Sequence, residues 1–167
     1  YNKIMQKITS HLWFDKEAKV ASEFYVSVFP NSKISNITTI TDTPSGDCDI
    51  VSFELAGQDF MAISAGPIFK FNPSVSFMVN FDPSKDTDAH TRIDQVWEKL
   101  SQDGKVLMPL DKYPFSDRYG WVQDKYGLSW QLILTKPEGE ERPVIITYIL
   151  FVGDKLEKSK DYDFRMK

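Results

Sequence analysis

The side chains of this sequence that could take part in chemistry are mostly neutral, and they recur at every second position of three short segments. The set comprises His11, Trp13, Ser74, Ser76, Met78, Ser129 and Gln131. Apolar and aromatic walls with a few neutral hydrogen-bonding groups are typical of a site that orients a small molecule without a charge. We therefore predict these seven residues as ligand contacts. The alternative is that a sheet packs a core there, with Trp13 and Met78 filling it.

Other groups that could act as acids, bases or nucleophiles have simpler interpretations. His90 and Asp94 have the i, i+4 spacing of one helix face, but the neighbouring Asp86 and Asp88 favour a solvated helix start over a metal site. Cys48 is the only cysteine, which excludes an intrachain disulfide, and we expect it to be a small buried residue. P-loop, Gly-x-Ser-x-Gly and His-Glu-x-x-His sequences are absent, so nucleophilic and phosphoryl-transfer chemistry have no visible carrier.

The elements that must position these residues occur in one order twice. Residues 7–14 alternate apolar and polar side chains as a half-buried strand does, and residues 17–29 have the three- and four-residue spacing of an amphipathic helix. Asp15 is placed to cap that helix. Strand-like segments follow near residues 33–41, 49–55 and 59–64. We predict a βαβββ module over about residues 7–65.

The second module is predicted over about residues 74–134. Its segments are a strand at 74–81, a helix from 87 or 88 to 102, and strands near 105–108, 120–123 and 129–134. In the last strand the alternation predicts that Trp130 faces the helices and Gln131 faces the pocket. The stretch 111–120 is interpreted as a loop over the mouth, where Tyr113 or Arg118 would meet a polar ligand.

The end of the sequence needs a separate interpretation. Residues 135–143 are rich in Pro, Glu and Gly and are typical of a linker. Residues 144–167 begin as an alternating strand and become highly charged, and they are too short to bury a face alone. Our hypothesis is that this extension docks on a sheet edge of its own chain or of a neighbour, and the alternative is a truncated or partly disordered end.

Four short stretches resemble one known family. "ITSHLWFD", "FYVSVFPNSKI", "GPIFKFNPSVSFMVN" and "GWVQDKYGLSWQ" are spread in order over most of the chain. Together they resemble the vicinal oxygen chelate (glyoxalase, bleomycin resistance, dioxygenase) superfamily, in its 3-demethylubiquinone-9 3-methyltransferase-like, or PhnB-like, branch. The resemblance implies an α+β fold in which tandem βαβββ modules form a curved mixed sheet around a concave pocket. It also implies a homodimer.

The same resemblance implies where a divalent metal would be held, by four side chains on the concave face. Carried over to this sequence, the first position falls on His11 and the second falls near Ser64. The third falls on Ser74 or Ser76, and the fourth falls on Gln131. Only one of the four is a strong ligand, and a divalent ion usually needs three or four to outcompete water. We therefore expect no metal and no other cofactor.

Three functions remain as hypotheses. The preferred one is metal-independent binding of a small, partly aromatic or planar molecule. The alternatives are a divalent-metal-dependent lyase or dioxygenase, and the methyltransferase that the branch name suggests. A methyltransferase of the common type needs a glycine-rich turn after its first strand, whereas the first glycine here is Gly46.

Length and charge limit the class of protein. A chain of 167 residues predicts one folded unit. Twenty Lys and Arg against 24 Asp and Glu give a net charge of −4, without a basic cluster, which disfavours nucleic acid and anionic membranes as partners. No apolar run approaches the ~20 residues that span a bilayer, and the start lacks the apolar region of a signal peptide. We expect a cytoplasmic protein.

Overall fold

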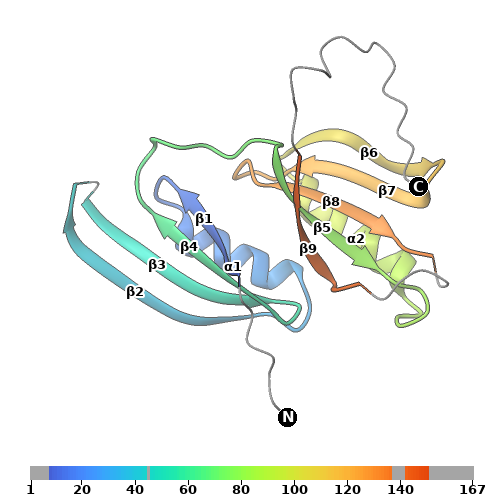
Figure 1. Cartoon of the computed structure of the whole chain (residues 1–167), viewed down its shortest axis with the longest axis horizontal. Helices are drawn as coiled ribbons and strands as arrows, with labels where there is room; N and C mark the ends of the chain where they lie inside the picture. The colour runs from blue at the N-terminus through green and yellow to red at the C-terminus, as the bar shows by residue number, and fades with distance from the viewer. Residues whose placement is uncertain (1–7, 45, 137–141, 151–167) are drawn as a thin grey trace, which may run out of the picture.

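The protein is described by a computed structural model over residues 8–44, 46–136 and 142–150, which form two mixed β-sheets with one helix packed on each (Figure 1). The predicted α+β fold of two βαβββ modules is confirmed. The single curved sheet expected from the resemblance is divided in two, because the first strands of the two modules do not pair within these ranges.

The first module has the predicted order of elements. These are β1 (Ser10–Phe14), α1 (Ala18–Val28), β2 (Lys33–Thr43), β3 (Gly46–Leu55) and β4 (Gln58–Ser64). The strands lie in the order β1-β4-β3-β2, and β1 runs parallel to β4. Ala56 and Gly57 form the tight turn between β3 and β4 with positive φ angles of 48° and 87°, which glycine adopts without strain.

The second module repeats the pattern and gains one strand. Its elements are β5 (Val75–Phe81), α2 (Ala89–Ser101), β6 (Lys105–Tyr113), β7 (Ser116–Gln123), β8 (Ser129–Leu134) and the additional β9 (Ile145–Ile149). The order is β6-β7-β8-β5-β9, with β5 parallel to β8. The prediction of a loop over residues 111–120 was wrong, because β6 and β7 extend into this range and form a hairpin.

One core joins the two modules on the helix side of both sheets. Trp130 is fully buried there, with its ring centroid 5.3 Å from Tyr25 of α1, 5.1 Å from Phe29 and 5.4 Å from Phe77 of β5. Burying a side chain of this size contributes roughly 1.5–3 kcal/mol. The prediction that Trp130 faces the helices is confirmed. We call the opposite side of the two sheets the outer face.

The turn between β7 and β8 is built around a buried carboxylate. Asp124 Oδ1 accepts hydrogen bonds from the N–H groups of Tyr126 at 2.8 Å and Leu128 at 3.1 Å, and Oδ2 accepts one from Trp130 Nε1 at 2.9 Å. Burial raises the pKa of the Asp124 carboxyl, and these hydrogen bonds oppose that rise. Gly127 completes the turn with a φ of 84°. The Asp-x-x-Gly turn therefore sets the start of β8.

The cap of α1 differs from the prediction. Ser64, at the end of β4, accepts a hydrogen bond on Oγ from the N–H of Ala18 at 3.1 Å. Asp15 was expected to cap this helix, but the capping position is Glu17 and its side chain makes no capping hydrogen bond. A residue distant in sequence therefore satisfies the first turn of the helix.

Strand β9 extends the second sheet along the edge of β5. The two strands are antiparallel, with Ile145 opposite Val79 and Ile149 opposite Val75. Ile145 is only 2% exposed, and its side chain belongs to the common core. Residues 137–141 of the predicted linker and residues 151–167 of the predicted extension lie outside the described residues.

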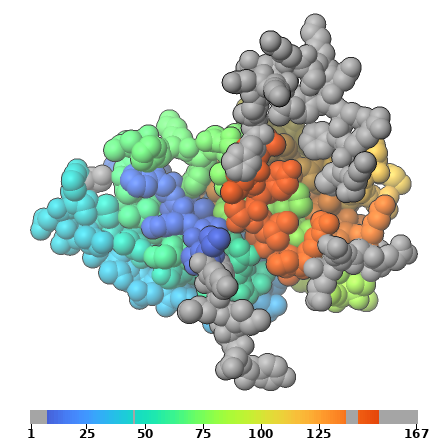
Figure 2. All heavy atoms as spheres, viewed as in Figure 1, coloured from blue at the N-terminus to red at the C-terminus, as the bar shows by residue number. Residues whose placement is uncertain are grey.

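Strand β9 also lies beside the first module. Figures 1 and 2 show it between β5 and β1, and the hydroxyl oxygens of Ser10 on β1 and Thr147 on β9 are 3.2 Å apart. The seam between the modules is thus occupied by a strand from the end of the chain. None of the helices in the described ranges is long and apolar enough to cross a membrane.

Candidate ligand-binding site

A cavity of about 330 Å³ lies where β1, β9 and the segment before β5 meet, and we call it the seam pocket. Its lining consists of Ser10, His11, Leu12, Trp13, Lys70, Phe71, Asn72, Val75, Phe77, Leu128 and Thr147. Leu12, Phe77 and Leu128 are buried core residues, so the floor of the pocket is apolar. The volume lies at the lower end of the range for small-molecule sites, about 300–1,000 Å³.

Two of the predicted contacts, His11 and Trp13, line this pocket from alternate positions of β1. Trp13 is half-buried, and its Nε1 donates a hydrogen bond to the Gly66 carbonyl at 2.9 Å. Its ring meets Phe69 edge to face, with the centroids 5.2 Å apart. His11 is exposed and makes no hydrogen bond with the part of the chain that the structure describes. Trp13 is therefore held in place, while the imidazole is available to a ligand.

The surroundings of His11 do not fit a divalent metal. On the neighbouring strand β4, His11 lies opposite Met61 and Trp13 lies opposite Ile63, which supply no strong ligand. Ser64, expected at a ligand position, faces the start of α1 instead. Within residues 8–44, 46–136 and 142–150, no three His, Cys, Asp or Glu side chains are grouped to hold an ion. One imidazole without a grouped carboxylate, thiolate or second imidazole among the described residues is too weak a donor set for such an ion.

Three other predicted residues belong to a buried network on the outer face of the second sheet. Gln131 accepts a hydrogen bond on Oε1 from the Tyr119 hydroxyl at 2.6 Å and donates from Nε2 to Ser76 Oγ at 2.7 Å. Ser129 Oγ accepts a hydrogen bond from Trp121 Nε1 at 2.7 Å. Gln131 is 4% exposed, and both ends of its amide are engaged. A ligand would have to compete with Tyr119 or Ser76 for this amide.

The network is uncharged. Burial raises the pKa of Tyr119 well above its ordinary value of 10, and the nearby hydroxyls of Tyr148 and Tyr113 raise it further. Tyr119 therefore stays protonated at neutral pH and donates its hydrogen bond to Gln131. The hydrogen bonds among these groups therefore form without a charged partner.

Strand β9 separates the two parts of the predicted site. Met78 lies opposite Ile146, and Ser76 lies opposite Tyr148, so side chains of β9 share the outer face with both. Ser74 is exposed just before β5. Of the seven predicted contacts, the structure brings His11 and Trp13 to the seam pocket and joins Ser76 to Gln131. Ligand contact by each of the seven stays a prediction.

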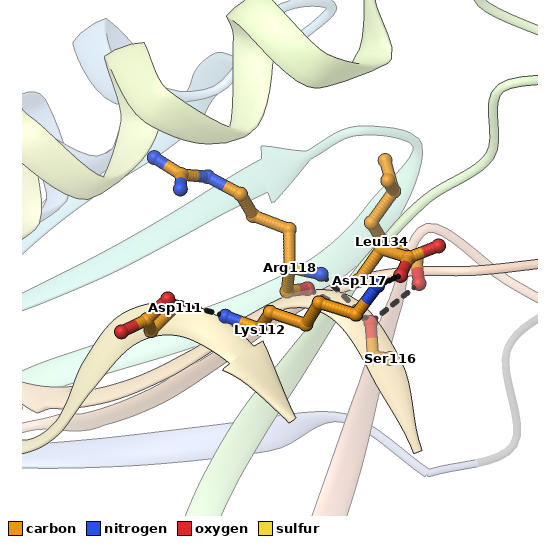
Figure 3. Close-up of polar contacts among 6 residues, drawn as sticks. All are labelled: Asp111, Lys112, Ser116, Asp117, Arg118 and Leu134. Carbon is orange, nitrogen blue, oxygen red and sulfur yellow. Dashed lines mark hydrogen bonds and ion pairs between the residues drawn. The ribbon is translucent and has the colours of Figure 1, made fainter. Parts of the chain in front are cut away.

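The β6–β7 hairpin is fixed by polar contacts that also orient its side chains (Figure 3). The Ser116 hydroxyl lies 2.8 Å from the Leu134 carbonyl, and Lys112 pairs with Asp117 at 2.8 Å across the hairpin. Arg118 points toward α2, where its Nε lies 2.8 Å from Asp94 Oδ1. The expectation that Arg118 meets a ligand at the pocket mouth was wrong, because it lies on the helix side of the sheet.

A second cavity, of about 370 Å³, lies at the other end of β5 and between the modules. Three of its charged residues already have partners: Arg92 Nε lies 2.6 Å from Asp86 Oδ2, and Asp82 accepts hydrogen bonds from the N–H and hydroxyl of Ser84. Because a ligand would have to break these contacts, the seam pocket is the better candidate site.

Sequence reasoning missed the residues that complete the seam pocket. Lys70, Phe71 and Asn72 come from the segment between the modules, and Thr147 comes from β9. The signal for the first three was the aromatic and turn-forming composition of residues 66–73, which was interpreted only as a connection. Thr147 carried no signal, because its place depends on the pairing of β9.

Comparisons with known proteins bear on this site. A model of the family described as 3-demethylubiquinone-9 3-methyltransferase matches residues 6–133. The solved structure of the Bacillus cereus PhnB protein is 40% identical, with a TM-score of 0.69, and the match covers 78% of this chain and 100% of that one. None of the curated proteins compared matches this chain. The family match ends before β9.

More distant solved structures share the fold. A glyoxylase/bleomycin resistance protein/dioxygenase domain from Frankia is 15% identical, with a TM-score of 0.53, over 81% of this chain and 96% of that one. A glyoxalase family protein from Bacillus cereus is 13% identical, with a TM-score of 0.51, over 80% of this chain and 95% of that one. At these identities the likeness concerns the fold alone.

Proposed function

Because the chain belongs to the 3-demethylubiquinone-9 3-methyltransferase family, which includes the PhnB protein, we propose that it binds a small organic molecule in the seam pocket without a metal. The observation that carries this proposal is the pocket of about 330 Å³, which combines an apolar floor with His11 and the held ring of Trp13. A one- or two-ring ligand would place its ring on the floor and its polar groups at the rim. The other predicted contacts, Ser74, Ser76, Met78, Ser129 and Gln131, do not line the seam pocket, and in this proposal only a larger ligand that extends across β9 would reach them.

The test is a thermal-shift screen of small aromatic compounds, with a variant that fills the pocket. Val75 lines the seam pocket and is 44% exposed, so Val75→Trp should block binding. Val106 on β6 is 46% exposed and lies on the far edge of the second sheet, so Val106→Trp is the matched control. Compounds that raise the melting temperature of the wild type and of Val106→Trp, but not of Val75→Trp, would support the site. Equal shifts in all three proteins would refute it.

Two enzymatic alternatives have direct tests. A divalent-metal lyase or dioxygenase requires near-stoichiometric metal, and less than about a tenth of an equivalent of Fe, Mn, Ni or Zn in chelator-free protein would exclude it. The family description favours a methyltransferase as a second candidate. The chain runs from β1 to α1 through Asp15 and Lys16 without a glycine-rich turn, so we expect no heat on titration with S-adenosylmethionine.

We also propose a homodimer. Support comes from exposed apolar side chains around β9, where Val144, Ile149 and Leu150 are 48%, 54% and 39% exposed. Exposed apolar side chains that gather on one surface commonly mark an interface. Light scattering should give twice the chain mass at micromolar concentration, and a monomer mass under those conditions would contradict the assembly.

A further inference from the structure

We propose, resting on the proposed function, that the seam pocket selects planar aromatic acids and that Lys70 is the residue that binds the acid group. The charges of the lining motivate this. Among the described residues that line the pocket, Lys70 is the only Lys or Arg, and none is Asp or Glu. In a chain with more acidic than basic residues, such a lining favours an anion over a cation.

The Lys70 ammonium group is available to a ligand. Lys70 is exposed and makes neither a hydrogen bond nor an ion pair within the described ranges of the chain. Two acidic side chains, Asp15 and Glu17, line an adjacent hollow together with Lys70 and form no ion pair with it. A cation without a partner at the rim of an apolar pocket gains a charge-assisted hydrogen bond when an oxyanion arrives.

The other polar groups of the rim complement an oxyanion as well. Asn72 Oδ1 accepts a hydrogen bond from the Ser74 N–H at 2.9 Å, which leaves the amide NH2 group of Asn72 as a donor. His11 lines the same pocket, is exposed, and can donate from either ring nitrogen, according to its tautomer. Ammonium, amide and imidazole donors thus line one rim, a set that matches the acceptor-only chemistry of a carboxylate.

The floor selects for a flat apolar body. Trp13 is fixed by its bond to Gly66, and Phe71 packs edge to face on Phe14 with centroids 5.1 Å apart. Phe77 is 1% exposed and closes the floor from β5. Rigid aromatic walls favour a planar ring, because offset or edge-to-face contacts need no rearrangement of the protein. A fused pair of aromatic rings with one carboxylate therefore fits both the floor and the rim.

The test compares two probes of equal shape, 2-naphthoate and its neutral analogue 2-naphthamide. The full chain is titrated with each probe, and binding is followed by calorimetry and by quenching of tryptophan fluorescence. At low salt the Kd for the carboxylate should be at least about tenfold lower than the Kd for the amide. This difference in Kd should become smaller in high salt, because salt screens the ion pair. Lys70→Gln should remove the preference, and Lys70→Arg should retain most of it. Lys105→Gln makes the same charge change at the start of β6 and should leave the preference intact.

The outcomes separate this proposal from the proposed function. Equal affinity of the wild type for both probes would overturn the selectivity for acids and leave the pocket as a binding site. A preference that survives in Lys70→Gln would overturn the role of Lys70. Failure of both probes to bind, or equal binding to Val75→Trp, would overturn the seam pocket and this proposal together.

Discussion

Replacing Ile145 by alanine should destabilise the whole protein, although β9 lies beyond the family match. Ile145 is 2% exposed and belongs to the core that both modules share. The substitution deletes three carbons, which at about 0.8 kcal/mol each amounts to roughly 2.4 kcal/mol of lost transfer free energy. A residual cavity adds to this, so we expect a loss of about 3 kcal/mol within the usual range of about 2–5 kcal/mol.

The matched control is the same substitution at the other end of the strand. Ile149 is 54% exposed, so Ile149→Ala should cost less than about 1 kcal/mol. Both variants are measured by urea unfolding, and the midpoint is read together with the slope so that a change in the unfolded state is recognised. For a chain of this size, a 3 kcal/mol loss lowers the melting temperature by about 6–12 °C.

Equal effects of the two substitutions would refute this reasoning, as would a loss below about 0.5 kcal/mol at Ile145. Either result would mean that β9 does not pack on β5 as a fixed part of the core. Because both substitutions remove the same atoms, a difference between their free energies of unfolding reports the burial of Ile145 and not a general effect of shortening isoleucine in this strand.

Three further predictions concern single contacts. Ser64→Ala should cost about 1–2 kcal/mol in urea unfolding, because the buried Ala18 N–H loses its acceptor, whereas Ser64→Thr should retain most of the stability. Gly120→Ala should cost about 1–3 kcal/mol, because its Cβ would lie 2.5 Å from the Trp97 ring, and a neutral effect would show that this ring moves freely. The folded pKa of Asp124 is raised above 3.8, so its stabilising contribution is complete below that pH and is lost as pH rises through the folded pKa. The stability of wild type relative to Asp124→Asn should therefore fall as the pH rises above 3.8, and a constant difference would contradict the raised pKa.

Most of the fold could be predicted from local patterns. The alternation along β5 and β8 and the helical spacing of α1 and α2 are properties of short segments, and each is set by which side chains must leave water. Trp130 and Gln131 were assigned to opposite faces for this reason, and the burial and contacts of Trp130 agree. The hairpin over residues 111–120 was missed because its turn formers and charges resemble a loop.

The candidate site could be predicted only in part. The sequence identified neutral side chains on the outer face, and His11 and Trp13 do line the seam pocket. It did not identify Lys70, because an exposed lysine in a connecting segment has no local signature. The resemblance put the second metal-ligand position of the family near Ser64, whereas the register puts Ser64 opposite Phe14, on the helix side. Such a face depends on pairing between strands distant in sequence.

The sequence by itself determined the two modules, the opposite faces of Trp130 and Gln131 and the neutral character of the predicted contacts, because periodicity and side-chain chemistry are local properties. The tertiary structure decided where those contacts meet. Strand β9 occupies the seam between β5 and β1, leaving His11 and Trp13 on one side and the Gln131 network on the other. Strand β9 is held there because Ile145 is buried in the common core. Its local sequence does not specify this place, since an alternating strand can pair with any free sheet edge.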